Sequence, residues 1–293
     1  MNSQAQRSPM GRERTTSQPI DDVIQDIVET FSGTLRFYAH DLETGRVISR
    51  DAEVVSPTAS CIKTFMLLVL MRDVDRGLWN LDETFLQTPE VLVGGSGTLK
   101  HLKGQTSLSL RNVAQLMIGL SDNVATNMIV DLLGKAHINR EIQALGFLNT
   151  EVRNRIDFDA VGDDLTRLAV STVKDCATLM QGLYQGTLLS AASSEVMLDI
   201  MGRQHYLDLL PRFLPINPYA EDLGEPSPIK VANKTGFYPG FRGDMAVIST
   251  AQKAIVICAF AIGSQDVSFN PESEPARTLG FLGQAIYDEM FQP

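Results

Sequence analysis

Residues 54–77 read VVSPTASCIKTFMLLVLMRDVDRG, a proline-containing loop that runs into a strongly apolar stretch ending at Gly77. The apolar residues predict a buried helix, with Ser60 at its start and Lys63 one turn further along the same face. A buried lysine that loses its proton easily can take the hydroxyl proton of such a serine. The N-terminal end of the helix also favours negative charge that develops beside the serine. Ser60 is therefore a candidate nucleophile with Lys63 as its base.

The Ser-x-x-Lys spacing alone has little weight, because the chain contains it three times, at Ser60–Lys63, Ser171–Lys174 and Ser227–Lys230. Only Ser60 opens a long apolar helix and is followed by two further motifs in the order that one class of serine hydrolases requires. These motifs are Ser121-Asp122-Asn123 and Lys234-Thr235-Gly236. Each alone has a structural explanation, since Ser-Asp-Asn can cap the helix after it and Lys-Thr-Gly can end a strand. Three motifs in this order favour catalysis.

Strand signals lie at both ends of the chain and helix signals in the middle. Residues 34–50 read as two short strands joined by a glycine-containing turn, and three alternating β-branched runs follow residue 228. We therefore expect an α+β fold. Its antiparallel sheet is formed from both chain ends and has flanking helices, and an all-helical domain is inserted between the two parts of the sheet. The expected boundaries are a disordered tail at 1–19, a sheet domain at 20–55 and 215–293, and a helical domain at 56–214, with the active site between the two domains.

Composition and charge exclude several classes of function. The 293 residues are 44% hydrophobic and carry a net charge of −10, and a field of that sign repels phosphate backbones. No apolar run approaches the roughly 18 residues of a membrane span, and the first residues lack the apolar core of a secretory signal. The histidines are scattered, and the three cysteines have the apolar neighbours of reduced, buried thiols. We expect no metal, no cofactor, no nucleic-acid or membrane partner and a cytoplasmic location, while the oligomeric state stays open.

From about residue 34 to the C-terminus, the chain resembles the class A β-lactamase family, within the wider superfamily of penicillin-binding serine acyltransferases. The stretch FYAHDLETGRVISRDAEVVSPTASCIK is similar to the first hairpin of that family and the approach to its nucleophile. SDNVATNMIVDLLG resembles the family's usual loop and helix, and KTGFYPGFRGDMAVIST its catalytic edge strand and the turn after it. The resemblance implies the β-lactamase/transpeptidase-like fold.

The resemblance also implies catalytic roles for the motif residues. Ser60 would attack an amide or ester carbonyl and become acylated, with Lys63 as its base or proton relay. Ser121 would pass a proton to the leaving nitrogen, and Lys234 would set the electrostatics of Ser121.

The substrate-binding residues that the resemblance implies are Asn123, Thr235, Gly236, Phe237 and Arg242. Asn123 would bind the side-chain amide of the substrate, and the backbone N–H of Phe237 would join that of the nucleophile in an oxyanion hole, where such donors contribute about 3–4 kcal/mol. Thr235 and Arg242 would hold a substrate carboxylate; Arg242 is otherwise a surface charge. The glycine-rich stretch 94–102 is expected on the rim of the cleft.

One departure from the family lies in the long loop after Ser-Asp-Asn. The family carries a Glu-x-x-Leu-Asn motif there, whose glutamate orients the water that hydrolyses the acyl-enzyme, whereas residues 150–172 read TEVRNRIDFDAVGDDLTRLAVST. By spacing, the glutamate position falls near Ile156 or Asp157, and Asp157 could replace it with a shorter reach. Asp159, Asp163 and Asp164 are further candidates, and each aspartate can also be a solvated loop charge.

The sequence therefore predicts a serine hydrolase that acts through a covalent acyl-enzyme on a small molecule, a β-lactam or a related cyclic amide or ester. It leaves open a β-lactamase with an altered deacylation loop and an intracellular amidase or esterase for a non-lactam metabolite. A binding or sensor protein that is acylated without turnover is the alternative from another class. A peptidoglycan transpeptidase or carboxypeptidase would need export, for which the N-terminus offers no signal.

Overall fold

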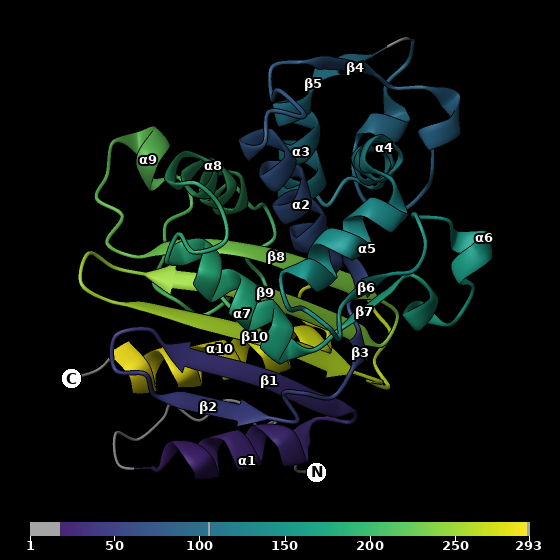
Figure 1. The fold of residues 1–293 in the computed structure, drawn as a ribbon. Helices are drawn as coiled ribbons and strands as arrows, with labels where there is room; N and C mark the ends of the chain where they lie inside the picture. Colours follow the sequence, from purple (N-terminus) through teal and green to yellow (C-terminus); the bar gives the residue numbers. More distant parts are fainter. Residues whose placement is uncertain (1–17, 105, 292–293) are drawn as a thin grey trace.

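The computed structural model describes residues 18–104 and 106–291, so the expected tail at 1–19 lies almost wholly outside the described residues. Its centre is a five-stranded antiparallel sheet in the order β2-β1-β10-β9-β8, which joins both ends of the chain (Figure 1). The strands are β1 (Thr34–Asp41), β2 (Val47–Arg50), β8 (Lys230–Tyr238), β9 (Phe241–Ser249) and β10 (Ala254–Ile262). This sheet and the helices inserted between β2 and β8 confirm the expected α+β fold.

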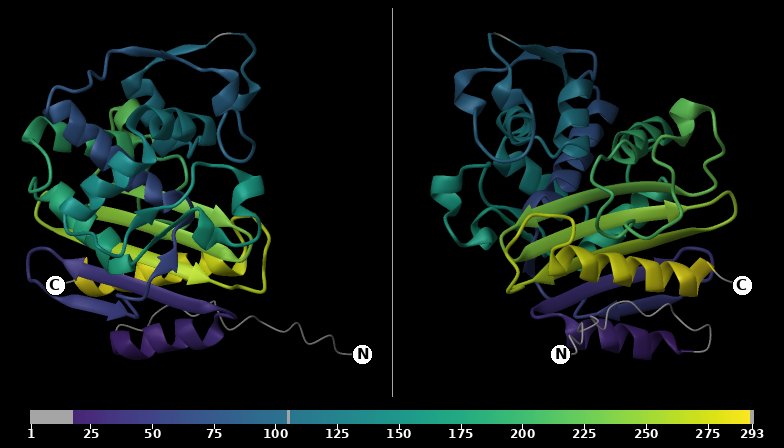
Figure 2. Two further views of the ribbon diagram at one scale, coloured as in Figure 1. Left: turned by 45° about the vertical axis from the view of Figure 1, so that its right-hand side comes forward. Right: turned by 180° about the vertical axis from the view of Figure 1, so that it is seen from behind.

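Helices cover both faces of the sheet (Figure 2). The first helix, α1 (Ile20–Thr30), and the last, α10 (Glu274–Phe291), pack together on one face, and α7 (Val173–Tyr184) packs on the other. β9 and β10 are buried on both faces, which explains the continuous apolar sequence of β10, whereas β9 also buries Arg242 and Asp244. Although α7 lies within the range 56–214, its contacts with the sheet join the helical insert and the sheet in one apolar core.

The helical insert is built around α2 (Lys63–Asp75), which follows the 3-10 helix η2 (Ala59–Ile62). Residues 65–71 are at most 1% exposed, as expected for a helix that is apolar on every side. The helices around it are α3 (Leu110–Gly119), α4 (Asn123–Leu133), α5 (Lys135–Ala144) and α8 (Ala191–Gly202). Because α2 cannot shift in this packing, it fixes the residues at its N-terminal end, where Ser60 and Lys63 lie.

Residues 150–171 are more ordered than the single long loop that their sequence suggests. Two short strands, β6 (Glu151–Val152) and β7 (Ala169–Ser171), form a small sheet with β3 (Ser56–Pro57). Between them lie the short helix α6 (Phe158–Val161) and the 3-10 helix η5 (Leu165–Arg167). β3 leads directly into η2, so both ends of this segment are anchored beside Ser60.

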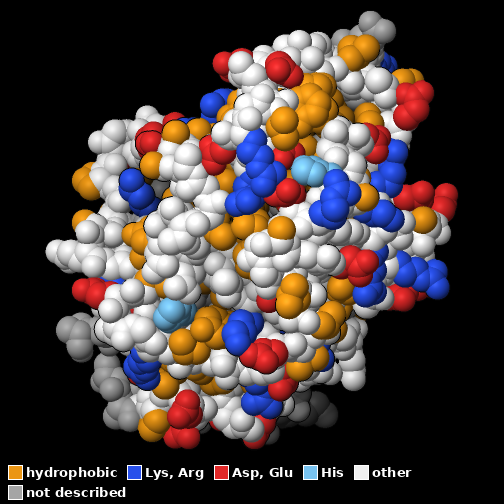
Figure 3. Space-filling view, in the orientation of Figure 1, with side chains coloured by type: hydrophobic (Ala, Val, Ile, Leu, Met, Phe, Trp, Pro, Cys, Tyr) orange, Lys and Arg blue, Asp and Glu red, His pale blue; other side chains and the backbone are white. Residues whose placement is uncertain are grey.

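The remaining short elements lie at the edges of the molecule. They are β4 (Thr84–Leu86), β5 (Ser107–Ser109), α9 (Ala220–Leu223) and the 3-10 helices η3 (Pro89–Val91) and η4 (Leu99–His101). In the view of Figure 1, acidic and basic side chains are interspersed over the surface (Figure 3). Within residues 18–104 and 106–291, no helix combines the length and apolarity that crossing a membrane requires.

The segment 204–210 is held against β8 and β9 by buried polar side chains. The Asn233 amide nitrogen donates to the backbone oxygen of Tyr206, at 3.3 Å, and to a carboxylate oxygen of Asp244, at 3.0 Å. The other Asp244 oxygen accepts the backbone N–H of Leu210 at 3.2 Å, and the Gln204 amide donates to the backbone oxygen of Ile118 at 3.0 Å. Both Asn233 and Asp244 are fully buried, so these bonds hold the segment in place without competition from water.

The C-terminal helix closes on the same segment at Gly283. A Cβ atom at this position would lie 2.1 Å from the backbone oxygen of Leu210, closer than any side chain tolerates. We expect Gly283→Ala to lower the free energy of unfolding by about 2 kcal/mol or more, because α10 or residue 210 must move. Gly202→Ala is the matched control, since a Cβ there meets only an ordinary contact at 3.8 Å and alanine favours a helix. Denaturant unfolding of both variants measures the difference, and equal stabilities would contradict the close packing.

Asp244 makes the stability of this region depend on pH. Burial raises the pKa of its carboxyl from 3.8 to about 7, although Asn233, Leu210 and nearby Lys234 favour the charged form. The folded state therefore holds a proton that the unfolded state has lost between about pH 4 and 7, and stability falls as pH rises through this window. Relative to Asp244→Asn, the wild type should lose up to about 1.4 kcal/mol of unfolding free energy per pH unit there and level off above pH 7. Parallel unfolding curves for the two proteins from pH 4.5 to 8.5 would contradict this assignment.

Candidate active site

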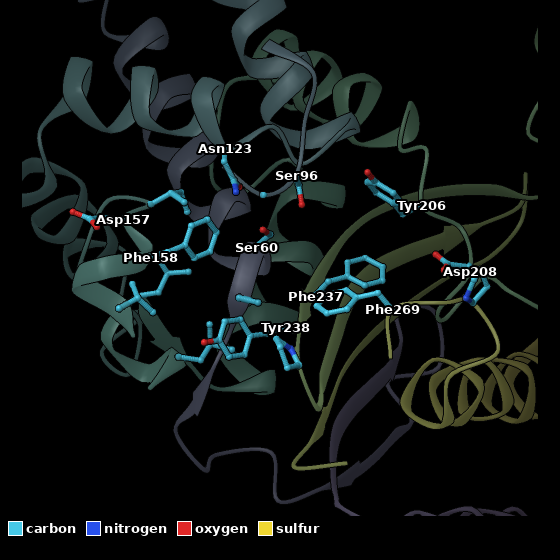
Figure 4. Close-up of a pocket in the computed structure, with 18 residues that line it drawn as sticks. Ser60, Ser96, Asn123, Asp157, Phe158, Tyr206, Asp208, Phe237, Tyr238 and Phe269 are labelled. Atoms are coloured by element: carbon cyan, nitrogen blue, oxygen red, sulfur yellow. The ribbon is translucent and has the colours of Figure 1, made fainter. Parts of the chain in front are cut away.

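Ser60 lines a cavity of about 500 Å³ between the helical insert and the edge strand β8, and Figure 4 shows it amid the other lining residues. It belongs to η2, directly before α2, and its side chain is partly exposed. The preceding residue, Ala59, has a φ of 44°, a left-handed conformation that is costly for a residue with a side chain. This strained turn presents Ser60 to the cavity, while its neighbour Cys61 is fully buried with its Sγ 3.4 Å from the backbone oxygen of Lys234.

Lys63 is fully buried, and all of its hydrogen bonds go to the Ser121-Asp122-Asn123 motif. Its Nζ donates to the backbone oxygen of Ser121 at 2.8 Å, to the Ser121 Oγ at 3.2 Å and to the Asn123 Oδ1 at 2.9 Å. Burial, followed by the charge of Lys234, lowers the pKa of Lys63 well below its usual value against the pull of Asp122. An amine of this kind can exchange a proton with the Ser121 hydroxyl over the observed contact.

The Asp122 carboxylate holds the Ser-Asp-Asn motif in place through hydrogen bonds to two backbone segments. One carboxylate oxygen caps α4 by accepting the N–H groups of Val124 and Ala125, as the structural explanation of the motif predicts. The other accepts the N–H groups of Thr98 and Leu99 at 2.6 and 2.9 Å and so ties the glycine-rich rim to the helix. The motif is thus a helix cap that also contacts the buried Lys63, and Ser121 itself has a left-handed φ of 53°; its catalytic role stays a prediction.

Asn123 lies between the rim and the buried lysine. Its Oδ1 accepts from Lys63, and its Nδ2 donates to the backbone oxygen of Gly94 at 3.0 Å. Gly95 and Ser96 line the cavity beside it, which confirms that this glycine-rich stretch forms a rim. The predicted contact of Asn123 with a substrate amide stays a prediction, with one amide hydrogen and one lone pair still open for it.

Lys234 and Gly236 face the nucleophile from β8. The Lys234 ammonium is fully buried, donates to the Thr235 backbone oxygen at 2.7 Å, and has its pKa lowered to about 8, chiefly by burial. A Cβ atom on Gly236 would lie 2.7 Å from the backbone oxygen of Thr58, so only glycine lets the strand approach η2 this closely. The backbone of Phe237 and Ser60 therefore lie along the same cavity wall, where the oxyanion hole is predicted.

The structure places two other predicted binding residues behind the cavity wall. Arg242 is fully buried, stacks on the rings of Phe237 and Phe269 with ring centres 5.0 and 4.9 Å away, and donates to the backbone oxygens of residues 238, 241 and 268. It is thus neither a surface charge nor part of the cavity lining. Thr235 pairs with Asp244 across β8 and β9 and is buried on the face of the sheet opposite Lys234. Carboxylate binding by Thr235 and Arg242 stays a prediction that requires these groups to become accessible.

The structure separates the two residues expected near the deacylation position. The Asn127 amide holds both backbone groups of Ile156, accepting from its N–H at 2.9 Å and donating to its oxygen at 3.0 Å, and Ile156 lines the cavity at 5% exposure. Asp157 is exposed, and its carboxylate caps α6 by accepting the N–H groups of Asp159 and Ala160. In Figure 4 it points away from Ser60. At the predicted deacylation position, the side chain that lines the cavity is therefore the apolar Ile156.

Several cavity residues were not singled out by sequence reasoning. On the side of the loop 153–168 they are apolar, and on the opposite side they are aromatic with one carboxylate. The first group comprises Phe158, Val161, Leu165, Leu168 and Tyr238, and the second Tyr206, Asp208 and Phe269, beside the predicted Phe237. The hydroxyl of Tyr238 donates to the backbone oxygen of Gly162 at 2.8 Å and ties the loop to β8. A run of aromatic residues after Lys-Thr-Gly was the only sequence signal for this lining.

Other predictions about the site concern sulfur and metals. All three cysteines are free and buried, which confirms the expectation of packed thiols. Within the described part of the chain, no cluster of histidine, cysteine, aspartate and glutamate has the arrangement of a metal site.

Known proteins share both this sequence and this architecture. A model of the beta-lactamase enzyme family matches residues 19–290. A beta-lactamase of Bacillus licheniformis is 25% identical over 253 residues, which cover 84% of this chain and 76% of that protein. The crystal structure of a beta-lactamase from Sphaerobacter thermophilus has the same fold, with a TM-score of 0.82 at 23% identity over 94% of this chain and 98% of that one.

PBP-A is similar at 28% identity and a TM-score of 0.74, over 92% of this chain and 98% of its own. A leucine-to-glutamate mutant of PBP-A has been solved as an acyl-enzyme complex with penicillin G. Because the family match spans nearly the whole sequence, and Ser60, Asn123 and Phe237, which belong to or follow the three motifs, line one cavity, the protein belongs to the beta-lactamase enzyme family and is a hydrolase of that family.

Proposed function

We propose that the protein forms a covalent acyl-enzyme at Ser60 with a small β-lactam or a related amide or ester, and that it releases the acyl group slowly. The family implies a β-lactam-like substrate. Slow release is supported by one observation. Asn127 holds the backbone of residue 156 at the cavity wall, and this residue is Ile156, whose apolar side chain cannot activate water. Asp157, the nearest carboxylate along the loop, is occupied as a helix cap.

Acylation uses the contacts of the buried lysines. The Ser60 oxygen bonds to the substrate carbonyl carbon while its proton passes to neutral Lys63. The Lys63 Nζ passes a proton to the Ser121 Oγ, 3.2 Å away, as the Ser121 hydroxyl gives its own proton to the leaving nitrogen or oxygen. The bond to the leaving group breaks, so the net result is a Ser60 ester and a protonated leaving group. Water then hydrolyses this ester to a carboxylic acid and restores Ser60.

The charges of the site suit this sequence of steps. Lys63 must be neutral to accept a proton, and burial disfavours its charged form most strongly. Lys234 keeps more of its proton near neutral pH, because its pKa falls only to about 8. Its positive charge stabilises the negative charge that develops on the substrate oxygen beside β8.

Intact-protein mass spectrometry tests the nucleophile and the slow release together. After mixing with benzylpenicillin, the wild type should gain one penicilloyl adduct that persists for minutes or longer, far beyond the roughly 0.1 s turnover of a typical enzyme. Ser60→Ala should gain none. Loss of the lactam without any adduct would show fast hydrolysis and contradict slow release. If neither adduct nor consumption occurs, the substrate is a non-lactam amide or ester, and the same Ser60 comparison applies to such compounds.

A glutamate at position 156 should supply the missing water activation. General-base catalysis contributes about 10²–10⁴-fold, so Ile156→Glu should shorten the lifetime of the adduct by at least about 100-fold and give steady hydrolysis. Leu148→Glu adds the same charge at an exposed site outside the cavity and should leave the lifetime unchanged. Thermal unfolding of each variant checks that the fold is intact. A loss of residual turnover in Asp157→Ala would instead assign the deacylating water to Asp157.

A further inference from the structure

The side of the cavity that faces the loop 153–168 forms an apolar chamber beside Ser60. Figure 4 shows Phe158 next to Ser60, on the side away from Asp208. Among the described residues, the one charged side chain that lines this side is Asp157, which is exposed, caps α6 and points away from Ser60. Apolar walls of this kind are typical of sites that bind an apolar group. The walls of the chamber are the side chains of Ile156, Phe158, Val161, Leu165, Leu168 and Tyr238.

The polar groups in the chamber walls already have partners within the protein. Both backbone groups of Ile156 are bonded to the Asn127 amide. The backbone oxygen of Leu168 accepts the N–H groups of residues 153 and 154 at 2.9 and 3.0 Å, and the Tyr238 hydroxyl donates to a backbone oxygen of the loop at 2.8 Å. A water molecule that enters the chamber therefore finds few hydrogen-bond partners, and an apolar ligand group gains affinity by displacing it.

The chamber adjoins the chain segment that carries Ser60. Pro57, three residues before Ser60, pairs with Val170 where β3 meets β7, and Leu168 directly precedes β7. A group bonded to the Ser60 oxygen therefore lies next to the chamber walls. Ser121, the proton donor to the leaving group in the proposed mechanism, is not one of the lining residues. The chamber thus faces the acyl half of a substrate, which stays bonded to Ser60 after the leaving group departs.

The chamber is formed before any ligand binds. The contacts of Asn127 with Ile156 and of Tyr238 with the loop fix its two walls relative to each other. The Phe158 ring closes against the rim, because a Cβ atom on Gly95 would lie 3.0 Å from that ring. The four aliphatic side chains of the chamber are at most 8% exposed. A cavity that is shaped in advance requires little ordering when a ligand binds, which increases the affinity that its contacts provide.

We propose that this chamber binds an alkyl or aryl group on the acyl half of the substrate. Ile156, at the position where sequence spacing predicts the water-orienting residue, forms one of its walls, so the space beside the acyl-enzyme holds an apolar group in place of an ordered water. This inference rests on the proposed acylation of Ser60 and names the substrate class of that site: amides or esters with an apolar acyl group. The phenylacetyl group of benzylpenicillin belongs to this class.

Alkylboronic acids test the proposal, because they contain no leaving group and bond reversibly to a serine oxygen. The Ser60 oxygen gives an electron pair to boron, its proton passes to Lys63, and the alkyl group takes the place of the acyl substituent. Affinity should rise about threefold for each added methylene, so butylboronic acid should bind about 30-fold more tightly than methylboronic acid. Titrations followed by NMR measure both affinities, and a butyl-to-methyl ratio near one would overturn the apolar chamber.

Variants of the chamber walls locate the alkyl group. Val161→Phe fills the chamber and should lower the butyl-to-methyl ratio to below about threefold, while binding of methylboronic acid shows that the site around Ser60 is intact. Val47→Phe adds the same ring on β2, at a residue 43% exposed and outside the cavity, and should keep the wild-type ratio. Phe158→Ala changes a residue that is 47% exposed, so it should fold normally and lower the ratio at least about threefold by admitting water. A ratio that survives both chamber variants would overturn the proposal.

Ser60→Ala separates this proposal from the acylation of Ser60. Without the boron–oxygen bond both acids should bind more weakly, but the ratio between them should remain, because the chamber is unchanged. Affinities that Ser60→Ala does not weaken would contradict the proposed nucleophile, and a preserved ratio would still support the chamber. Weaker binding in Ser60→Ala together with a wild-type ratio near one would overturn the chamber and leave the nucleophile in place.

Discussion

The burial of the Lys63 amine constrains the rest of the site. A fully buried amine needs acceptors, and all three that Lys63 has come from Ser121 and Asn123. Those acceptors are in place only because the Asp122 carboxylate caps α4 and holds the rim through four N–H groups. Ser60 is presented one turn before the same amine by a helix that is buried on every side. Burial of α2 thus both positions Ser60 and lowers the pKa of Lys63, as the proposed roles of nucleophile and base require.

The edge strand β8 completes this arrangement from the other domain. Gly236 permits close contact with η2, and Lys234 brings a second buried amine to the same wall. The charge of Lys234 disfavours the charge of Lys63, so a proton is easier to remove from Lys63 than from an isolated lysine. The cavity between the two halves of the protein then differs along its length, apolar beside the loop 153–168 and aromatic and acidic beside Asp208.

The parts of this structure that follow from local sequence could be predicted. The long apolar run of α2, the alternating strands at both ends and the three motifs all lie in short continuous stretches, and the structure brings the motifs together. The two- and three-residue strands β3, β6 and β7 are too short to have a periodicity. The position of Arg242 could not be predicted either, because it depends on two aromatic rings, one of them 27 residues away in the sequence. The placement of the segment 204–210 depends on buried hydrogen bonds of Asn233 and Asp244 that no spacing reveals.

The contact between Asn127 and residue 156 has a consequence for which substitutions the loop can accept. Asn127 holds only the backbone N–H and oxygen of that residue, so the anchor is indifferent to the side chain that the position carries. The shape of the loop is therefore set independently of the side chain at position 156. A substitution there can change the chemistry of the cavity wall while the scaffold that places the residue stays intact.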